Sequence, residues 1–450
     1  MSIIPPEATW LLCEFAPVFT QPTYRRAVLL LLGAILTTGR RTVANVLRTV
    51  GTLAQGDPSS FQRVLSSARW SGLQLACALT RIIVCCFYRS GVILLAGDDT
   101  VDEHRGKKVY GKSRHRDAVR SSHSYTAHRY GHKWVVLSIL VRFPFARRYW
   151  ALPVLVALYR SPKDNRARHR PHKTPVELMR LLLRVLLRWF PGREFQFAGD
   201  GGFGTHELSR FTQESGARLS LVSRFRADAN LYAPAPPPRK SKKGGRPRLK
   251  GAKMPSPQEV VAQTRKRQRL TVAWYGGSVR RVEVVTAIGH WYKSGAGLVP
   301  VRWVYVRDLD GTHRDDYLFT TNVNLTAQEI IEAYTRRWNI ETTFEEMRAH
   351  LGLETTRGWS RWTVLRAAPC LFGLYTVVAL LYWGLPRRYK AGVRLSWEGK
   401  TDTTFSDAIT AVRRWLWTAW VFETTGHDHA FAKLPRRFRT TLLYALAPAA

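Results

Sequence analysis

Acidic side chains are scarce in this chain of 450 residues. Asp and Glu number 32 against 70 Lys and Arg, and the formal net charge is +38. A chain with this excess of positive charge attracts polyanions at long range and releases their counterions on binding. The composition therefore favours nucleic acid as the partner and leaves an anionic membrane surface as the alternative.

Cysteine is also scarce, and its spacing excludes two kinds of cross-linked fold. The chain has five cysteines, an odd number, and none of them forms a Cys-x-x-Cys pair. This pattern argues against a disulfide framework and against a zinc ribbon, and it fits a reducing compartment. The cysteines are Cys13, Cys77, Cys85, Cys86 and Cys370.

Long apolar runs are nearly absent. Residues 367–384 form a run of 18 uncharged residues, which is short for a membrane span, contains Pro369 and directly follows Arg366. We therefore expect a buried core helix there and no membrane partner. The chain does not open with a charged segment followed by a cleavable apolar one, so a cytoplasmic location is expected.

Apolar and aromatic residues, by contrast, are plentiful. The chain is 45% hydrophobic and 12% aromatic, which indicates a globular protein with a sizeable core rather than a disordered one. Its 16 Trp and 17 Tyr also supply surfaces on which bases could stack. The length predicts about two to four domains.

Residues 1–90 are predicted to be helical, with short turns and faces rich in Arg and Ser. This pattern is compatible with a helix-turn-helix module that binds DNA. A plain helical bundle fits the same pattern equally well, so both interpretations stay open.

From residue 91 the pattern changes to strands that alternate with helices. A strand at 91–97 is followed by a basic, histidine-bearing loop at 103–132. Further strands are expected at 133–143, 149–159, 194–199 and 219–225, with helices at 174–190 and 205–216. Three strands, a helix, a strand, a helix and a strand, followed by a late helix, is the element order of a ribonuclease H-like core.

The remainder of the chain divides into four parts. Residues 232–257 are rich in Pro, Lys and Gly and are predicted to be a mobile basic segment. Alternating residues at 270–321 predict a small antiparallel β unit. A capped helix at 326–352 and the apolar helix follow, and the chain ends in a basic helical region.

The predicted fold is therefore α/β: a ribonuclease H-like mixed sheet with flanking helices, a β-rich insertion before the last core helix, and a helical N-terminal domain. The predicted divisions are residues 1–90 for the helical domain, 91–226 for the first part of the core, 227–322 for the basic linker and insertion, 323–385 for the last core helices, and 386–450 for the basic C-terminal region.

The late helix carries a distinctive polar face. Thr326 and Glu329 fit a capping box, and Gly352 is a stop signal. Five polar residues spaced by 3, 4, 4 and 3 positions share one stripe of this helix, namely Tyr334, Arg337, Glu341, Glu345 and Arg348. The apolar residues lie largely on another face and are Ile330, Ile331, Ile340, Phe344 and Met347. On its own, the polar stripe is typical of a solvated face joined by salt bridges.

Carboxylates stand at the ends of the predicted core elements. Asp98 and Asp99 follow the first strand, Asp200 follows the fourth, and Glu341 and Glu345 lie on the late helix. In a ribonuclease H-like core the first and fourth strands are neighbours, so their aspartates would meet at one edge. Mg²⁺ prefers oxygen ligands, and two such ions about 3.5–4 Å apart support phosphoryl transfer. As simple turn residues, Asp99 and Asp200 would have no such role.

These residues resemble the DDE transposases of bacterial insertion sequences. Tyr334, Arg337 and Glu341 match the Tyr-x2-Arg-x3-Glu-x6-Lys helix of one branch, and Arg348 stands where that branch has Lys. "GDDT" at 97–100 is similar to the first-aspartate motif, Asp-x-Thr, which favours Asp98 over Asp99. "AGDGGFG" at 198–204 is similar to the second motif. The resemblance covers roughly residues 91–359.

The resemblance implies a cut-and-paste DNA transposase with a DDE catalytic triad of Asp98, Asp200 and Glu341. Two Mg²⁺ ions, for which Mn²⁺ can substitute, would be held by these residues, with Asp99 as the alternative first ligand. The enzyme would cut the ends of its element and transfer the freed 3′-hydroxyl into target DNA, and this branch can pass through a DNA hairpin.

The resemblance also implies DNA contacts. Tyr334, Arg337 and Arg348 would hold phosphates, and Trp338 would stack on a flipped base, with Trp274 or Trp291 as a second wedge. The implied partners are double-stranded DNA, as terminal inverted repeats and as target, and a second copy of the chain in the active complex. The implied location is the bacterial cytoplasm, in association with the nucleoid.

Two other motifs are discounted. "GDGGFG" at 199–204 also fits the dinucleotide fingerprint, but Asp200 would face a pyrophosphate with like charge. The histidines of the basic loop could indicate zinc, but no Cys lies near them and Gly131 argues against a helix that would pair two of them. We therefore expect these histidines to face solvent or phosphate; they are His104, His115, His123, His128 and His132.

Two other functions remain as alternatives. One is a catalytically inactive or repurposed DNA-binding relative, although the presence of all three carboxylates argues against it. The other is a membrane-attached basic protein that rests on residues 367–384.

Overall fold

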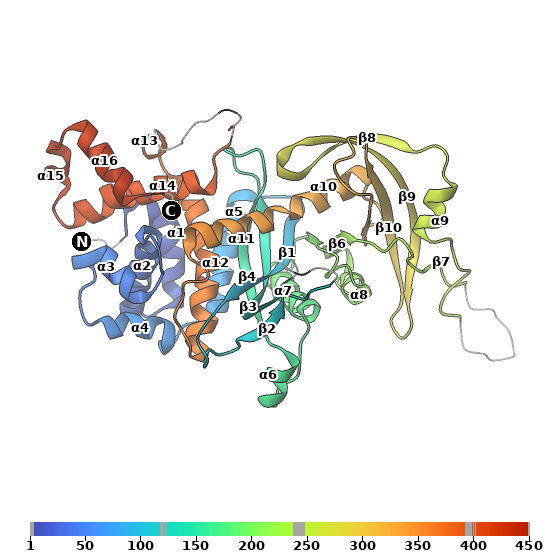
Figure 1. The fold of residues 1–450 in the computed structure, drawn as a ribbon, viewed down its shortest axis with the longest axis horizontal. Coiled ribbons are helices and arrows are strands. Elements are labelled where there is room, and N and C mark those ends of the chain that lie inside the picture. Colours follow the sequence, from blue (N-terminus) through green and yellow to red (C-terminus); the bar gives the residue numbers. More distant parts are fainter. Residues whose placement is uncertain are drawn as a thin grey trace.

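The computed structural model describes residues 4–117, 121, 124–236, 248–391, 398, 400 and 402–448. It is a mixed α/β fold built on an 11-stranded sheet, with helices on both faces and a large helical body at one end (Figure 1). Part of the predicted basic segment and His123 lie outside the described residues.

One half of the sheet has the strand order β4-β3-β1-β5-β6, and β2 pairs with the first residues of β3, on the side away from β1. β1 pairs with β3 and β3 with β4 in antiparallel fashion, whereas β1 with β5 and β5 with β6 are parallel. The bounds are β1 (Ile93–Glu103), β2 (Ser113–Arg116), β3 (His128–Val141), β4 (Trp150–Tyr159), β5 (Phe195–Gly199) and β6 (Leu219–Arg224).

Two strands are longer than the sequence predicts. β1 was expected to end before Asp98 but continues to Glu103, because β3 pairs with it as far as Gly131. β3 begins at His128, five residues earlier than expected, so His128 and His132 lie in a strand and not in a loop. Both strand ends are set by hydrogen bonding to the neighbouring strand, which the local residue pattern does not reveal.

The other half of the sheet comes from the segment that the sequence predicts to be a β-rich insertion. β11 pairs with β6 in antiparallel fashion, at Leu318 opposite Arg224, so the insertion continues the core sheet. The bounds are β7 (Leu231–Tyr232), β8 (Gln268–Ala273), β9 (Val279–Lys293), β10 (Gly297–Asp308) and β11 (Asp316–Thr320), with α9 (Pro257–Gln263) beside them. At the described end of the basic segment, Lys250 Nζ lies 3.9 Å from the Tyr232 ring centroid.

Helices cover the two faces of the core strands. α7 (Pro175–Trp189) begins at a capping box of Thr174 and Glu177, with Pro at its first turn, as the sequence predicts. α8 (His206–Glu214) follows β5, and the short α6 (Pro162–Ala167) follows β4. Met179 of α7 lies next to Gly97 of β1. α11 contacts β1 and β4, and α12 contacts β4.

The late helix is present but divided. α10 (Ala327–Arg337) and α11 (Asn339–Leu351) follow one another end to end across the molecule, with Trp338 at the junction (Figure 1). The capping box of Thr326 and Glu329 and the left-handed Gly352 at the end are as predicted. The apolar residues of the two helices are buried, namely Ile330, Ile331, Ile340, Phe344 and Met347.

α12 (Arg361–Gly384) is, among the described residues, the one helix long and apolar enough to cross a membrane. Its most apolar window is 72% buried inside the protein, where the helix contacts β4, α11 and α14. Phe372 of α12 meets the fully buried Trp134 of β3, with ring centroids 6.4 Å apart. This burial fits the expected core helix.

The N-terminal and C-terminal helices form one body, and both ends of the chain lie on it (Figure 1). The buried Arg413 of α14 donates from Nε to the Ile35 carbonyl of α2 at 2.7 Å. The principal helices are α2 (Gln21–Leu36), α3 (Val43–Val50), α4 (Pro58–Ser66), α5 (Gly72–Phe87), α13 (Arg387–Lys390), α14 (Phe405–Leu416), α15 (Asp428–Lys433) and α16 (Arg436–Leu446).

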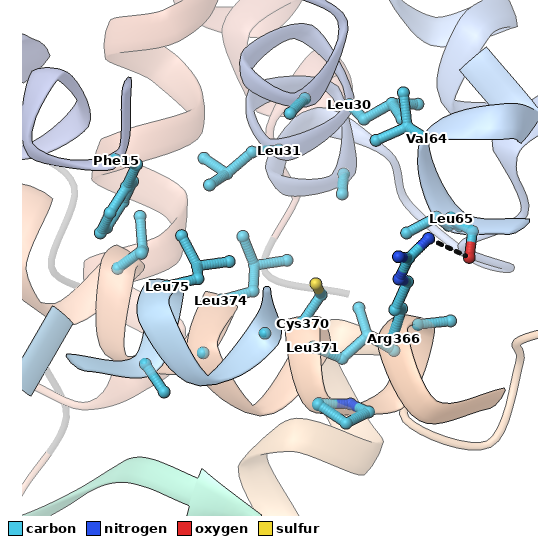
Figure 2. Close-up of a pocket in the computed structure, with 18 of the residues that line it drawn as sticks. Phe15, Leu30, Leu31, Val64, Leu65, Leu75, Arg366, Cys370, Leu371 and Leu374 are labelled. Carbon is cyan, nitrogen blue, oxygen red and sulfur yellow. Dashed lines mark hydrogen bonds between the residues drawn. The ribbon is translucent and has the colours of Figure 1, made fainter. Parts of the chain in front are cut away.

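A largely apolar cavity of about 450 Å³ lies between α2, α5 and α12 (Figure 2). Leu31, Leu75 and Leu374 are among its lining residues. Arg366 lies at one side, where its Nη2 donates to the Ala68 carbonyl at 2.8 Å.

Candidate active site

Asp98 and Asp200 lie side by side because of strand register. β1 and β5 are parallel neighbours, and Gly97 is paired with Gly199, so each aspartate is the next residue along its chain. Neighbouring strands are about 4.8 Å apart, which brings the two carboxylates to one place. A Cβ at Gly97 would stand 2.4 Å from the Phe197 ring, so glycine is needed beneath Asp98.

Arg337 joins Asp98 to Glu341. Its Nη1 donates to Asp98 Oδ2 at 3.1 Å, and its Nη2 donates to Glu341 Oε1 at 2.9 Å. The Arg337 side chain is 7% exposed and that of Glu341 41% exposed. The structure thus brings together carboxylates from β1 and α11 around one buried guanidinium, with Asp200 beside them.

Burial raises the pKa of Asp98 to about 7, although Arg337 opposes this rise and the nearby Asp200 adds to it. A buried carboxylate next to a second carboxylate is costly to ionise. For Arg337, burial alone would lower the pKa, but Asp98 and Glu341 outweigh it and the pKa is raised. The site therefore concentrates negative charge that a cation stabilises.

Asp99 points to the opposite face of the sheet. Its Oδ2 accepts from Lys133 Nζ of β3 at 2.9 Å. The pKa of Asp99 is raised, mainly by burial and also by the charge of Asp200, although Lys133 opposes the rise. Because successive residues of a strand face opposite sides, the structure groups Asp98, and not Asp99, with Arg337 and Glu341.

Asp200 also has the role of a turn residue. Its Oδ1 accepts from the backbone N–H of Gly202 at 3.0 Å and of Phe203 at 3.3 Å. Ser223 Oγ donates to its carbonyl at 2.7 Å. These bonds fix the carboxylate at the end of β5, so the turn and a ligand role are compatible.

Comparison with known proteins places the chain. The family described as DDE superfamily endonuclease matches residues 14–281, which include Asp98 and Asp200. The chain belongs to this family of DDE endonucleases. A second family, described as "Archaeal putative transposase ISC1217", matches residues 298–382, which include Glu341.

No curated protein matches this DDE endonuclease. Among solved structures it is similar to the cryo-EM structure of a piggyBac transposase synaptic complex with hairpin DNA. The identity is 10% and the TM-score 0.41, over 98% of this chain and 82% of that one. A similarity this low supports no conclusion about the site.

Tyr334 and Arg224 extend the site of the DDE endonuclease. Tyr334 is buried, with its ring centroid 5.4 Å from the Arg337 guanidinium and 5.8 Å from that of Arg224. Arg224 ends β6, and its Nε donates to Asp316 Oδ2 at 2.8 Å. The polar stripe of the late helix is therefore not simply solvated: Tyr334 and Arg337 face inward.

Sequence analysis did not select Arg224. The signal was available, because Arg224 is the last residue of the strand next to β5 and so stands at the same end of the parallel strands as Asp200. Its basic side chain adds a second cation to the site.

Aromatic rings lie beside Arg337 on the surface. Trp338 is 37% exposed, so it is not a core residue, and its ring centroid lies 6.2 Å from that of Tyr275. Trp274 contacts Tyr275 at 5.2 Å. Trp291 instead packs against Phe225 and Phe319. Of the two candidate wedges, Trp274 is therefore the one grouped with Trp338.

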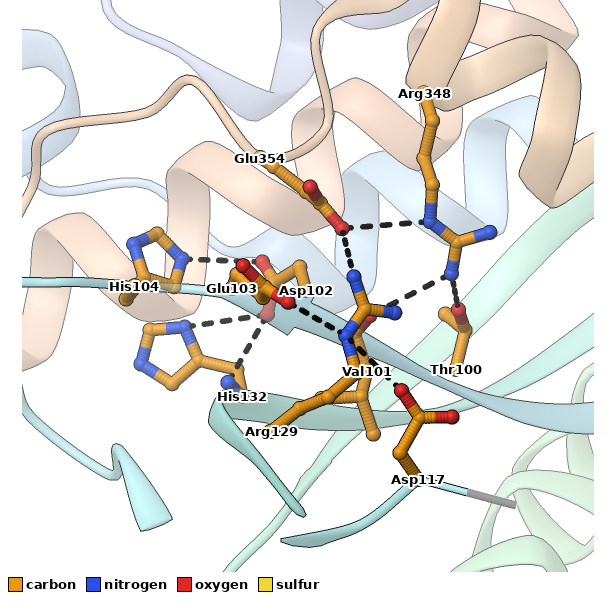
Figure 3. Close-up of polar contacts among 10 residues, drawn as sticks. All are labelled: Thr100, Val101, Asp102, Glu103, His104, Asp117, Arg129, His132, Arg348 and Glu354. Carbon is orange, nitrogen blue, oxygen red and sulfur yellow. Dashed lines mark hydrogen bonds and ion pairs between the residues drawn. The ribbon is translucent and has the colours of Figure 1, made fainter. Parts of the chain in front are cut away.

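Arg348 of α11 contacts β1 at Thr100, two residues beyond Asp98. Its Nη2 donates to Thr100 Oγ1, and its Nε lies 3.5 Å from Glu354 Oε1 (Figure 3). Thr100 shares a strand face with Asp98, so Arg348 flanks the site. Glu345, the alternative third carboxylate, is exposed.

Two groups of residues could hold metal ions. Asp98, Asp200 and Glu341 offer oxygen donors only, which suit Mg²⁺ or Mn²⁺. Asp102 at the end of β1, His104 just after it and His132 of β3 offer a second set, with two imidazole nitrogens. The prediction that the loop histidines face solvent or phosphate is wrong for His104, His115 and His132, which are buried.

Proposed function

We propose that this DDE endonuclease is a DNA transposase of the cut-and-paste type. It would cut at the ends of its element and join the freed 3′-hydroxyl to target DNA. The observation that carries the proposal is the meeting of Asp98 and Asp200 at paired positions of β1 and β5, with Glu341 linked to Asp98 through Arg337.

The proposal includes a ribonuclease H-like core interrupted by the β-rich insertion. The strand order β4-β3-β1-β5-β6, with two antiparallel pairs followed by two parallel pairs, supports this assignment. The insertion between β6 and α10 occupies the predicted place. The predicted divisions of the chain into domains stand as part of this proposal.

Asp98, Asp200 and Glu341 would hold two Mg²⁺ ions, and Mn²⁺ could take their place. The bound ions would supply charge stabilisation for the attacking and leaving oxygens of a phosphoryl transfer. Their fit is supported by the acid-only donor set and by Arg337, whose guanidinium neutralises Asp98 and Glu341 in this structure. Burial and Asp200 raise the pKa of Asp98 although Arg337 opposes the rise, so a metal ion would have further negative charge to stabilise.

The basic residues around the acids would orient DNA. Arg337 and Arg224 would attract phosphates by their charge, and the Tyr334 ring lies 5.4 and 5.8 Å from their guanidinium groups. Arg348 would contact a phosphate farther along the strand. The exposed Trp338, with Trp274 nearby, offers a ring for a base flipped out as a strand end folds into a hairpin.

The proposed partners are the terminal inverted repeats, target DNA and a second copy of the chain. The net charge of +38 supports DNA binding, and work on two element ends requires two active sites. The Tyr334, Arg337 and Glu341 spacing supports a place among bacterial insertion-sequence enzymes. That assignment puts the protein in the bacterial cytoplasm, at the nucleoid.

The experiment is a cleavage assay on a plasmid that carries the gene with its native flanking DNA. The parent should excise the element in Mg²⁺ or Mn²⁺, and Asp200→Asn and Glu341→Gln should not. Glu345→Gln, which changes an exposed acid one turn away, is the matched control and should cut like the parent.

The same assay separates the alternatives. If the parent binds this DNA but neither it nor any variant cuts, the protein is a DNA-binding relative without catalysis. If Asp200→Asn cuts as fast as the parent, the carboxylate cluster is not the active site and the proposal is wrong.

A further inference from the structure

Three buried residues converge at the far end of β1. His104 Nε2 lies 3.2 Å from Asp102 Oδ2, and His132 Nδ1 lies 3.6 Å from Asp102 Oδ1 (Figure 3). Asp102 is 0% exposed, and the side chains of His104 and His132 are 7% and 2% exposed. One ligand atom from each residue lies within 4.8 Å of the others.

The outer nitrogen of His132 is hydrogen-bonded to the backbone. Its Nε2 lies 2.8 Å from the Tyr110 carbonyl, an acceptor, so Nε2 must carry a proton. In the neutral ring this leaves Nδ1 with a lone pair that points toward a carboxylate oxygen. Among the described residues Nδ1 has no hydrogen-bond partner, and 3.6 Å is too long for one to Asp102.

A cation between these atoms would accept the Nδ1 lone pair and would neutralise the carboxylate that faces it. We propose that Asp102, His104 and His132 bind a Zn²⁺ ion, with a water molecule in the fourth position. Zn²⁺ takes imidazole nitrogen and carboxylate oxygen at about 2.0–2.1 Å, so ligand atoms around a tetrahedral ion stand about 3.3–3.4 Å apart. The separations of 3.2 Å from His104 Nε2 to Oδ2 and 3.6 Å from His132 Nδ1 to Oδ1 are close to this spacing, with each imidazole facing a different oxygen of Asp102. The Tyr110 carbonyl then orients the His132 ring, as such acceptors do at metal sites.

The backbone holds this geometry rigidly. Asp102 and His132 are directly opposite in the antiparallel ladder of β1 and β3, and Asp102 Oδ1 accepts from the His132 N–H at 3.1 Å. His104 N donates to the Tyr130 carbonyl at 3.0 Å. A Cβ at Gly131 would stand 1.7 Å from the Asp102 carbonyl, so only glycine allows β3 to approach β1 this closely.

The site is separate from the proposed catalytic one. Asp102 faces the same side of the sheet as Asp98 but lies four residues on, which is about 13 Å along a strand. Its donors include two imidazoles, which suit Zn²⁺, whereas the catalytic set offers oxygen only. The ion would fasten the segment after β1 to β3, and Tyr110 in turn donates its N–H to the Trp359 carbonyl at 2.9 Å.

The test is a metal count on the full-length protein, purified without chelator and dialysed against Zn²⁺ and then against buffer. The parent should hold one Zn²⁺ per chain by plasma mass spectrometry, and His132→Ala and Asp102→Asn should hold almost none. His128→Ala, at an exposed histidine of the same strand, is the matched control and should keep the ion. Asp200→Asn should also keep it while failing to cut DNA, which separates this inference from the proposed function.

A second measurement uses the parent alone, in case the variants fold poorly. Zinc-edge X-ray absorption should show two imidazole nitrogens with oxygen donors and no sulfur. A folded parent that holds far less than one equivalent would overturn the proposal. Sulfur ligation, or full zinc retention in a folded His132→Ala protein, would do the same.

Discussion

Arg337 donates to Asp98 at 3.1 Å, across 239 positions of the chain. The same guanidinium donates to Glu341 one helical turn away. A cation thus already stands among the acids, supplied by the protein itself. This bond ties α10 to β1 and makes the stability of the fold depend on the charges of the site.

Arg337→Ala should destabilise the protein by about 3 kcal/mol, because it leaves a buried carboxylate without its partner. Urea unfolding monitored by circular dichroism measures this loss, and added Mg²⁺ should recover part of it. The matched control is Arg336→Ala, which breaks the more exposed pair with Glu332 and should cost under about 1 kcal/mol. Equal losses in the two variants would show that Arg337 does not neutralise the site.

Asp98 and Asp99 should respond differently to the same substitution. Asp98→Asn should reduce cutting about a thousandfold, since metal-assisted charge stabilisation contributes several kcal/mol. Asp99→Asn removes the Lys133 pair on the other face and should leave most of the activity. Initial rates of plasmid cutting in Mn²⁺ compare the two. A larger loss in Asp99→Asn would make Asp99 the first ligand.

Trp338 should matter to DNA and little to the fold. Trp338→Ala should weaken binding of DNA ends by about 1–3 kcal/mol, because it removes a stacking surface, and should shift the melting temperature little because the side chain is partly exposed. Trp291→Ala should do the reverse, costing about 3–5 kcal/mol of stability from a packed aromatic cluster. Titration with end-containing duplexes and thermal melting together measure both effects. A Trp338→Ala protein that melts far below the parent would show a packing role instead.

His115 gives the fold a dependence on pH. Burial, with help from Lys133, lowers its pKa to about 4, below the usual 6.5. The unfolded chain therefore binds this proton more readily, so stability is complete above about pH 6.5 and falls toward pH 4. Relative to His115→Asn, the parent should lose up to about 3 kcal/mol between pH 7 and 4. His128→Asn, at an exposed position of β3, should show the same change in unfolding free energy with pH as the parent, measured by urea unfolding. If the difference in unfolding free energy between the parent and His115→Asn does not change with pH, the pKa of His115 is not lowered in the folded protein.

Much of the site could be predicted from the sequence because its parts follow local rules. The capping box at Thr326 and Glu329 and the apolar spacing after it define the late helix. Asp200 follows a short apolar strand and a glycine. The closeness of Asp98 and Asp200 follows from strand register, because Gly97 of β1 is paired with Gly199 of the parallel β5.

Other parts could not be predicted because they depend on partners distant in the chain. β1 extends past Asp98 only because β3 lies alongside it. The burial of His104 and His132 depends on that same pairing, so a basic, histidine-bearing stretch looked like a loop.

The pairing of β11 with β6 has a consequence for how this protein can vary. Val222, Val304 and Leu318 form with Tyr334 a cluster that seats α10 on the joined halves of the sheet. Deleting residues between β6 and α10 would remove the apolar side chains against which Tyr334 packs. Arg337, on the same helix, would then lose its position next to Asp98. Natural relatives should therefore lengthen or shorten the loops of this insertion freely while keeping its strands, and a deletion series across β8 to β11 should yield insoluble protein rather than a smaller working enzyme.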